Sequence, residues 1–246
     1  MPELIDKLIV ALDVDSLEKA EHFVGVLYPT VKFFKVGSQL FTACGPEAVK
    51  MIGNKGAQAF LDLKFYDIPN TVGKVVSAGT GLSCEMIAVN TDVGQESRMH
   101  WPVFMMTVHI DLEGGREMLE KAVNGAKGKA RELNRDKPYI VGVTVLTSSN
   151  NEANTSRIVL GKAKLAQKAG LDGVVCSVYE AAAVRKECGE EFIIVTPGIR
   201  PKGYPADDQK RTATAAEAIA AGADYIVIGR PILETKDPLK AVSELL

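Results

Sequence analysis

Cysteine is scarce in this chain, and its spacing excludes two kinds of site. The 246 residues include four cysteines, and no two of them form a Cys-x-x-Cys pair. Structural zinc sites and dithiol redox centres usually need such a pair. Isolated thiols fit a reducing compartment, so we expect a cytoplasmic protein. The four positions are Cys44, Cys84, Cys176 and Cys188.

Histidine is also scarce, and long hydrophobic runs and a charge excess are missing. The three histidines lack the spacing of metal ligands, which disfavours a catalytic transition metal. No segment approaches the ~18 apolar residues of a membrane span, and the first residues lack the apolar stretch of a secretory signal. The 29 basic and 31 acidic side chains give a net charge of −2, so neither nucleic acid nor a membrane is expected as a partner.

Short apolar runs are what the chain has in quantity. Hydrophobic residues make up 46% of it, enough for one sizeable core. Runs rich in Val and Ile alternate with stretches of helical periodicity, as expected for parallel strands that are covered by helices. The predicted strands are 8–13, 32–37, 59–64, 104–109, 139–146, 173–177, 192–196 and 225–229. The predicted helices are 17–27, 46–55, 69–80, 115–131, 156–169, 179–188, 212–221 and 237–245.

Eight strand–helix units predict a single (β/α)8 barrel that occupies residues 1–246. A doubly wound open sheet is the main alternative, but no Gly-x-Gly-x-x-Gly follows the first strand. Chemistry in barrels lies at the carboxyl ends of the strands. The polar residues at those ends are Asp13, Lys35, Asp62, Lys64, His109, Thr147, Ser177, Arg200 and Arg230.

Residues 60–71 carry three charges where an apolar strand ends and a helix begins. Side chains alternate along a strand, so Asp62 and Lys64 share one face, and Asp67 is expected to fold back toward the same pocket. A lysine between two carboxylates stays protonated and can act as a local acid. Two ordinary alternatives remain open, namely an ion pair at the strand mouth and an Asp67 that caps the helix at Pro69.

Two loops near the carboxyl terminus are suited to binding an anion. Each contains a glycine and an arginine, in Thr196–Arg200 after the seventh strand and in Ile228–Arg230 after the eighth. Glycines allow backbone N–H groups to approach an oxyanion, and an arginine adds bidentate bonds. These loops are the frequent phosphate site of barrels, so we expect a phosphorylated ligand. Two plain turns with surface arginines are the alternative.

Taken together, these segments resemble the orotidine 5′-phosphate decarboxylase family. The resemblance spans nearly the whole chain, in the family's order, and the run Asp-x-Lys-x-x-Asp-Ile-Pro is its most specific part. The matching segments are Ala11–Asp13, Phe34–Gly37, Asp62–Thr71, Val145–Ser148, Thr196–Arg200, Asp208–Gln209 and Ile228–Arg230.

The resemblance implies a reaction and a set of catalytic residues. The reaction is cofactor-independent decarboxylation of orotidine 5′-monophosphate to UMP and CO2, in pyrimidine synthesis. Lys64 would donate a proton to C6 of the pyrimidine, and Asp62 would lie next to the substrate carboxylate. Lys35 and Asp67 would complete an alternating charge network, with Asp67 supplied by the partner subunit of a homodimer that shares its active sites.

The same resemblance implies the binding residues. Asp13 and Lys35 would contact the ribose, and Thr147 would hydrogen-bond the pyrimidine edge. Residues 201–210 resemble a mobile lid. Two residues near the dimer interface would be Ile68 and Thr71. The phosphate end would comprise Pro197, Arg200, Gln209, Gly229 and Arg230.

Residues 83–103 depart from the family's pattern, in which a short turn joins the third helix to the fourth strand. We expect 104–109 to be the fourth strand, because Gly-Gly-Arg-Glu-Met follows it. A fourth strand at 86–90 is the alternative. An insertion before the fourth strand would lie at the amino end of the barrel, spare catalysis and offer a partner surface. His109 is expected to be a structural residue.

Two other functions remain open. One is a Mg²⁺-dependent decarboxylase or aldolase that acts on a sugar phosphate with a barrel of the same type. Such enzymes share Asp-x-Lys-x-x-Asp but lack the Ile-Pro-x-Thr continuation and the Thr-Pro-Gly-Ile-Arg loop. The other is a non-catalytic nucleotide-binding protein that the insertion has disabled.

Overall fold

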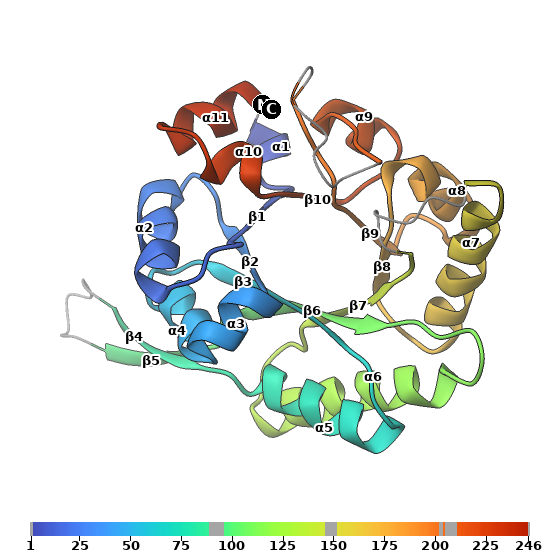
Figure 1. Ribbon diagram of the computed structural model, residues 1–246. Helices are drawn as coiled ribbons and strands as arrows, with labels where there is room; N and C mark the ends of the chain where they lie inside the picture. Colours follow the sequence, from blue (N-terminus) through green and yellow to red (C-terminus); the bar gives the residue numbers. More distant parts are fainter. Residues whose placement is uncertain (1, 89–95, 146–151, 202–203, 205–210, 246) are drawn as a thin grey trace.

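A closed barrel of eight parallel strands forms the centre of the molecule (Figure 1). The computed structural model describes residues 2–88, 96–145, 152–201, 204 and 211–245. Around the barrel the strand order is β1-β10-β9-β8-β7-β6-β3-β2, which confirms the predicted (β/α)8 barrel. The barrel strands are β1 (Leu8–Ala11), β2 (Phe33–Gly37), β3 (Gln58–Phe65), β6 (Val103–His109), β7 (Tyr139–Val143), β8 (Gly173–Val175), β9 (Ile193–Thr196) and β10 (Tyr225–Ile228).

Helices surround the barrel, and alternation along the strands divides the apolar residues into two cores (Figure 1). The inner core is small, and the outer core lies between strands and helices. The inner core consists of Ile9, Ala11, Phe60, Met105, Val141, Val195 and Val227. The helices are α1 (Pro2–Ile5), α2 (Leu17–Leu27), α3 (Ser38–Cys44), α4 (Glu47–Asn54), α5 (Pro69–Thr80), α6 (Arg116–Glu132), α7 (Glu152–Lys168), α8 (Val178–Cys188), α9 (Ala215–Ala220), α10 (Arg230–Leu233) and α11 (Pro238–Leu245).

The fourth barrel strand is β6, as predicted for 104–109. It pairs in parallel with β3 on one side and with β7 on the other. The alternative segment near 86–90 lies outside the barrel, because β4 (Cys84–Ala88) pairs antiparallel with β5 (Glu96–His100) in a separate hairpin. Figure 1 shows this hairpin projecting past α4. Since it joins α5 to β6, it leaves from the amino-end side of the barrel.

Several predicted boundaries were wrong by a few residues. The predicted strands 139–146 and 173–177 run past the observed ends of β7 and β8, because the apolar composition continues after the strand pairing stops. A helix was predicted at 212–221, but the observed helix α9 starts at Ala215. Thr214 is its N-cap, and Ala213 pairs with Ile199 in a short parallel bridge. The short helices α1, α3 and α10 were not predicted.

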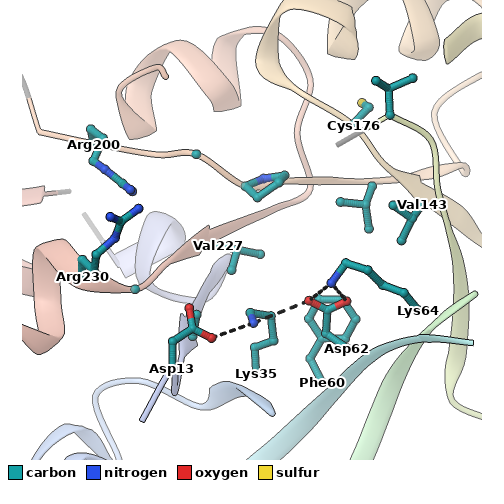
Figure 2. Close-up of a pocket in the computed structure, with 16 residues that line it drawn as sticks. Asp13, Lys35, Phe60, Asp62, Lys64, Val143, Cys176, Arg200, Val227 and Arg230 are labelled. Carbon is teal, nitrogen blue, oxygen red and sulfur yellow. Dashed lines mark hydrogen bonds and ion pairs between the residues drawn. The ribbon is translucent and has the colours of Figure 1, made fainter. Parts of the chain in front are cut away.

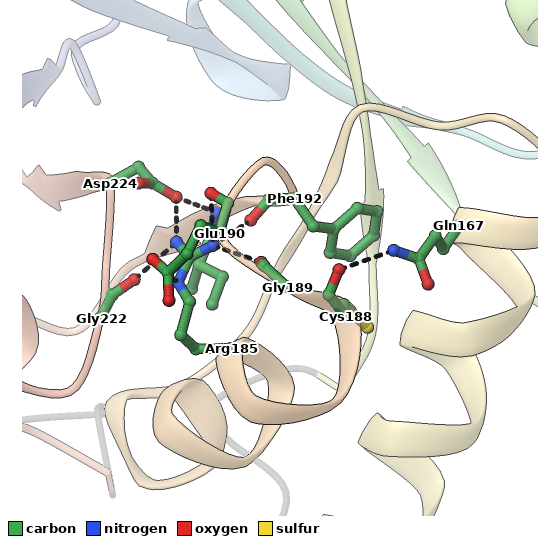
Figure 3. Close-up of polar contacts among 9 residues, drawn as sticks. Gln167, Arg185, Cys188, Gly189, Glu190, Phe192, Gly222 and Asp224 are labelled. Atoms are coloured by element: carbon green, nitrogen blue, oxygen red, sulfur yellow. Dashed lines mark hydrogen bonds and ion pairs between the residues drawn. The ribbon is translucent and has the colours of Figure 1, made fainter.

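Arg185 of α8 holds together the segments that lead into two barrel strands (Figure 3). Its guanidinium donates to the carbonyl oxygens of Phe192 and Gly222 at 2.8 and 2.9 Å. It also donates to Asp224 Oδ2 at 2.6 Å, and the same oxygen accepts the Ile194 amide at 2.8 Å. These bonds fix β9 and β10 at their amino ends, on the side of the barrel opposite the carboxyl ends of the strands.

Two further sequence expectations concern thiols and membranes. The cysteines whose side chains the structure describes, Cys44, Cys176 and Cys188, are free thiols. Within the described ranges, no helix is both long enough and apolar enough to cross a membrane.

Candidate active site

The carboxyl ends of the barrel strands open into a cavity of about 370 Å³. That volume is in the range of sites for small-molecule ligands. Both ends of the chain contribute to its lining, because β1 pairs with β10 when the barrel closes. The charged residues of the lining are Asp13, Lys35, Asp62, Lys64, Arg200 and Arg230.

Four of these residues form a row of alternating charge across three neighbouring strands (Figure 2). Lys35 Nζ lies 3.1 Å from Asp13 Oδ1 and 3.5 Å from Asp62 Oδ2. Lys64 Nζ lies 2.9 and 3.0 Å from the two oxygens of Asp62. The order follows from the fold, because β1, β2 and β3 lie side by side and each places one or two of these residues at its carboxyl end.

Burial and charge act in opposite directions on the two central groups. Burial disfavours the Lys35 ammonium, but the carboxylates of Asp62 and Asp13 outweigh it and raise the pKa of Lys35 above its usual value. Burial likewise disfavours the Asp62 carboxylate, but Lys35 and Lys64, with a hydrogen bond from Thr107, lower its pKa. Both groups are therefore charged throughout the neutral pH range.

The backbone at Lys64 has a left-handed conformation, with φ of +51°. This conformation is uncommon outside glycine and persists when neighbouring contacts enforce it. Here Thr107 of β6 accepts a hydrogen bond from the Lys64 amide at 2.8 Å and donates one to Asp62 Oδ1 at 3.0 Å. The β3–β6 register also shifts between Leu61 and Phe65. A buried hydroxyl thus fixes both the Lys64 backbone and the Asp62 carboxylate.

The space around the charged row is set by small and apolar residues. A Cβ atom at Gly37 would lie 2.9 Å from Lys35 Nζ, so glycine leaves room for the ammonium. Val143 and Cys176 stand on the opposite wall (Figure 2). Burial, together with the charge of Glu180, raises the pKa of the Cys176 thiol to about 12. The wall is therefore neutral, and the charged row faces an apolar surface.

Two arginines form the other end of the cavity. Arg200 follows β9, Arg230 follows β10, and their side chains extend toward one another (Figure 2). The backbone beside Arg200 is fixed by two bonds to Ala213, from Arg200 N to Ala213 O at 2.9 Å and from Ala213 N to Gly198 O at 3.3 Å. Gly198 has φ of +79°, a conformation that favours glycine. Two neighbouring guanidinium groups are chemically suited to binding an anion.

Not every predicted residue lines this cavity. Asp67 does not fold back into it within one chain; its carboxylate is exposed and accepts the Ile68 amide at 2.6 Å in the turn before Pro69. Ile68 is the N-cap of α5, so Asp67 does not cap that helix either. Ile68 and Thr71 also lie outside the cavity lining. Pro197 and Gly229 do line it.

Two predicted binding residues, Thr147 and Gln209, lie outside the described residues. Most of the predicted lid, 201–210, does so as well. His109 is half-buried and absent from the lining; its Nδ1 lies 3.3 Å from Ile110 O, and its ring packs against Tyr66.

Sequence reasoning missed Thr107 and the apolar wall. One signal could have identified Thr107, because it lies two residues after the inward-facing Met105 in an apolar strand and must share its face. Valines on the wall carry no such signal, since any barrel interior contains them.

Comparison with known proteins agrees with this geometry. The model of the Orotidine 5′-phosphate decarboxylase / HUMPS family matches residues 6–245. An orotidine 5′-phosphate decarboxylase of Moorella thermoacetica is 43% identical over 245 residues, which cover 96% of this chain and 89% of that protein. One of the same name from Pelobacter propionicus is 39% identical, over 98% of this chain and 93% of that protein.

A solved structure gives the same result for the fold. The crystal structure of orotidine 5′-phosphate decarboxylase from Lactobacillus acidophilus has a TM-score of 0.77 and 33% identity to this chain, and the match covers 98% of this chain and 97% of that one. The resemblance predicted from the sequence motifs is thereby confirmed. A family match over nearly the whole chain, together with relatives of about 40% identity, shows that the chain belongs to the orotidine 5′-phosphate decarboxylase / HUMPS family.

Proposed function

We propose that this protein decarboxylates orotidine 5′-monophosphate to UMP in cytoplasmic pyrimidine synthesis, without a cofactor. One observation carries the proposal. A row of alternating charges and a pair of arginines line the same cavity, and the row runs from Asp13, near Arg230, to Lys64 at the far end from the arginines (Figure 2). A nucleotide with a phosphate at one end and a carboxylate on its base needs both. The names of the curated relatives support the same substrate.

The phosphate would lie between Arg200 and Arg230, near the backbone of Pro197 and Gly229. The ribose would then lie near Asp13 and Lys35, and the base near Asp62 and Lys64. Thr147 and Gln209 complete the proposed contacts, to the base edge and the phosphate. Phosphate binding far from the reacting carbon can supply free energy for excluding water at that carbon.

The chemical step would use Lys64 as the acid. The bond between C6 and the carboxylate breaks, CO2 leaves, and the electron pair stays on C6. Lys64 Nζ stabilises that developing charge and then transfers a proton to C6, forming the C–H bond of UMP. Asp62, next to Lys64 Nζ at 2.9 Å, holds the ammonium in place. Lys64 regains a proton from solvent.

The charge arrangement disfavours the Mg²⁺-dependent alternative. Lys35 Nζ already lies between the carboxylates of Asp13 and Asp62, so a divalent cation there would meet an ammonium. Among the described residues, no group of three or more His, Cys, Asp or Glu side chains is placed to hold a metal.

The first test measures conversion of orotidine 5′-monophosphate to UMP in excess EDTA, with the loss of substrate absorbance as the signal. Rapid conversion supports the proposal. The absence of both turnover and UMP binding would favour the Mg²⁺-dependent sugar-phosphate type of enzyme. UMP binding without any turnover would favour the non-catalytic nucleotide-binding protein.

Lys64→Ala should retain UMP binding and lose catalysis. Because a positioned acid typically contributes about 10²–10⁴-fold, we expect kcat to fall by at least that factor. UMP affinity measured by calorimetry should change little, since the two arginines remain. Substantial residual turnover would show that another group is the acid.

We further propose a homodimer with shared active sites, in which Asp67 enters the partner's cavity and Ile68 and Thr71 lie at the interface. Asp67 and Ile68 are exposed in the single chain, Ile68 at 67%, which leaves them available to a second copy.

A complementation experiment tests the shared sites. Asp67→Ala and Lys64→Ala should each be nearly inactive alone, because each site then lacks one charge of the network. Mixed under subunit exchange, they should recover activity of roughly a quarter of the wild-type value, since half of the dimers are mixed and each has one intact site. Asp67→Ala mixed with itself is the control. No recovery in a confirmed mixed dimer would contradict the proposal.

A further inference from the structure

A buried ion pair lies behind the cavity wall, and neither of its residues lines the cavity. Glu180, in the first turn of α8, is only 1% exposed, and its Oε1 accepts a hydrogen bond from Arg211 Nη2. None of the described residues donates to its other oxygen, Oε2. A buried carboxylate with one partner is strongly dependent on that partner. Arg211 is therefore held tightly at this position.

The first turn of α8 also contacts Arg211 and its neighbour through Tyr179. The Arg211 guanidinium lies over the Tyr179 ring, 5.2 Å from its centroid. The Tyr179 hydroxyl donates to the Thr212 carbonyl oxygen at 3.2 Å. Residues 211–212 are thus fixed to α8 by an ion pair, a cation–π contact and a hydrogen bond. We call Tyr179, Glu180, Arg211 and Thr212 the α8 clamp.

The clamp is one residue away from the backbone that presents Arg200. Ala213 follows Thr212 directly and makes both hydrogen bonds that fix Gly198 and Arg200. Gly198 and Arg200 line the anion end of the cavity. On the other side of Ala213, Thr214 begins α9 with a capping box to Glu217, which holds that end of the segment.

We infer that Arg211 is a positioning residue for the anion end of the cavity, acting through Ala213 on the backbone of Gly198 and Arg200. This inference rests on the proposed function for its substrate. Arg211 is not among the residues that line the cavity, so its loss should weaken binding of the phosphate and leave the chemistry at Lys64 unchanged.

The test uses two clamp variants and one matched control. Arg211→Met removes the ion pair and the cation–π contact. Tyr179→Leu removes a ring that is 62% exposed, so this variant should fold even if the first does not. Arg185→Met is the control, because Arg185 also anchors α8 to neighbouring backbone, at its other end and away from the cavity.

For Arg211→Met we expect KM for orotidine 5′-monophosphate to rise about tenfold or more, with little change in kcat. A shift of the Arg200 backbone would weaken the charge-assisted bonds between Arg200 and the phosphate. Tyr179→Leu should raise KM in the same direction by a smaller factor. Arg185→Met should lower the melting temperature and leave KM unchanged. UMP should bind both clamp variants more weakly, whereas uridine, which has no phosphate, should bind them as it binds the wild type.

The outcomes separate the inference from the proposed function. A folded Arg211→Met with unchanged KM overturns the inference, as does an Arg185→Met that raises KM equally. Equal weakening of uridine and UMP would also overturn it, since the clamp would then support the whole barrel mouth. If wild type does not convert orotidine 5′-monophosphate, the proposed function fails, and the comparison of UMP with uridine still tests the clamp. A wild type that binds no UMP overturns both.

Discussion

Asp62 is the residue on which the charged row depends. It lies between two ammonium groups and accepts the Thr107 hydroxyl, while its own side chain is 12% exposed. Removing its charge leaves Lys35 with Asp13 alone and Lys64 without a described carboxylate partner within the chain. A buried charge without its partner is costly, so the row is stable only as a set.

Asp62→Asn should therefore destabilise the fold in a pH-dependent way. We expect a loss of about 2 kcal/mol or more at neutral pH, at the low end for buried pairs because Lys64 is partly exposed. Since the pKa of Asp62 is lowered from 3.8, its contribution is complete above that pH and disappears as the pH falls further below it. The difference between wild type and variant, measured by urea unfolding, should be constant from pH 5 to 8 and shrink below pH 3.8.

At high pH the stability depends on pH in the opposite direction, because of Lys35. The pKa of Lys35 is raised above 10.5, so its contribution is complete below that pH and is lost as the pH rises above it. A difference between wild type and Asp62→Asn that varied between pH 5 and 8 would show that another titrating group dominates.

At the scale of elements, the contact between β3 and β6 is the point where the strand geometry becomes irregular. The left-handed backbone conformation of Lys64 and the register shift change the direction of the end of β3. Thr107 on β6 stabilises the Lys64 conformation. Irregularities of this kind concentrate at functional sites because a regular strand would aim the side chain elsewhere.

Thr107→Val should lower kcat more than it changes KM. Valine keeps the shape but leaves the Lys64 amide and one Asp62 oxygen without this partner, which costs about 1–3 kcal/mol of stability. Because the Lys64 ammonium is then less well placed, we expect kcat to fall about tenfold or more. Thr107→Ser keeps the hydroxyl and should retain most activity. An active Thr107→Val would show that the conformation of Lys64 does not depend on this hydroxyl.

The elements also show which predictions sequence can support. The order of the barrel strands follows from local patterns, and this prediction was correct. The short helices α3 and α10 span seven and four residues, too few for a period of 3.6 to repeat clearly. The β4 segment resembled a barrel strand by composition, and only its pairing with β5 instead of β3 separates the two possibilities.

For the site, strand-end positions predicted the row of charges and the two arginines, because parallel strands end at one face of a barrel. Sequence could not predict the conformation of Lys64 or the role of Thr107, since both depend on a contact between residues 43 positions apart. Asp67 shows the other limit, because the place proposed for it lies in a second chain, and local patterns carry no information about such a contact.

At the scale of the whole molecule, the hairpin of β4 and β5 is separate from the cavity. It leaves from the amino-end side of the barrel, beside α4, whereas the site lies at the carboxyl ends of the strands. The hairpin and the site therefore share no described residue.

Replacing 84–100 with a short linker should preserve catalysis. We expect kcat/KM to stay within about threefold of wild type, because loops at that end of a barrel serve stability. Thermal unfolding and size measurements on the same variant report whether the hairpin supports the fold or a partner surface. A large fall in kcat/KM with normal stability would show that the hairpin reaches the site, for example through a second subunit.

The pairing of β1 with β10 joins the beginning of the chain to its end. The alternating charges all lie between residues 13 and 64, and the two arginines lie at 200 and 230, so neither group of residues contains a complete site. At the junction the two parts are close enough that a Cβ atom on Gly229 would lie 3.4 Å from Asp13 Oδ2. A ligand that reaches from the arginines to the charges spans this junction and ties the two ends of the chain together, so binding and closure of the barrel reinforce each other.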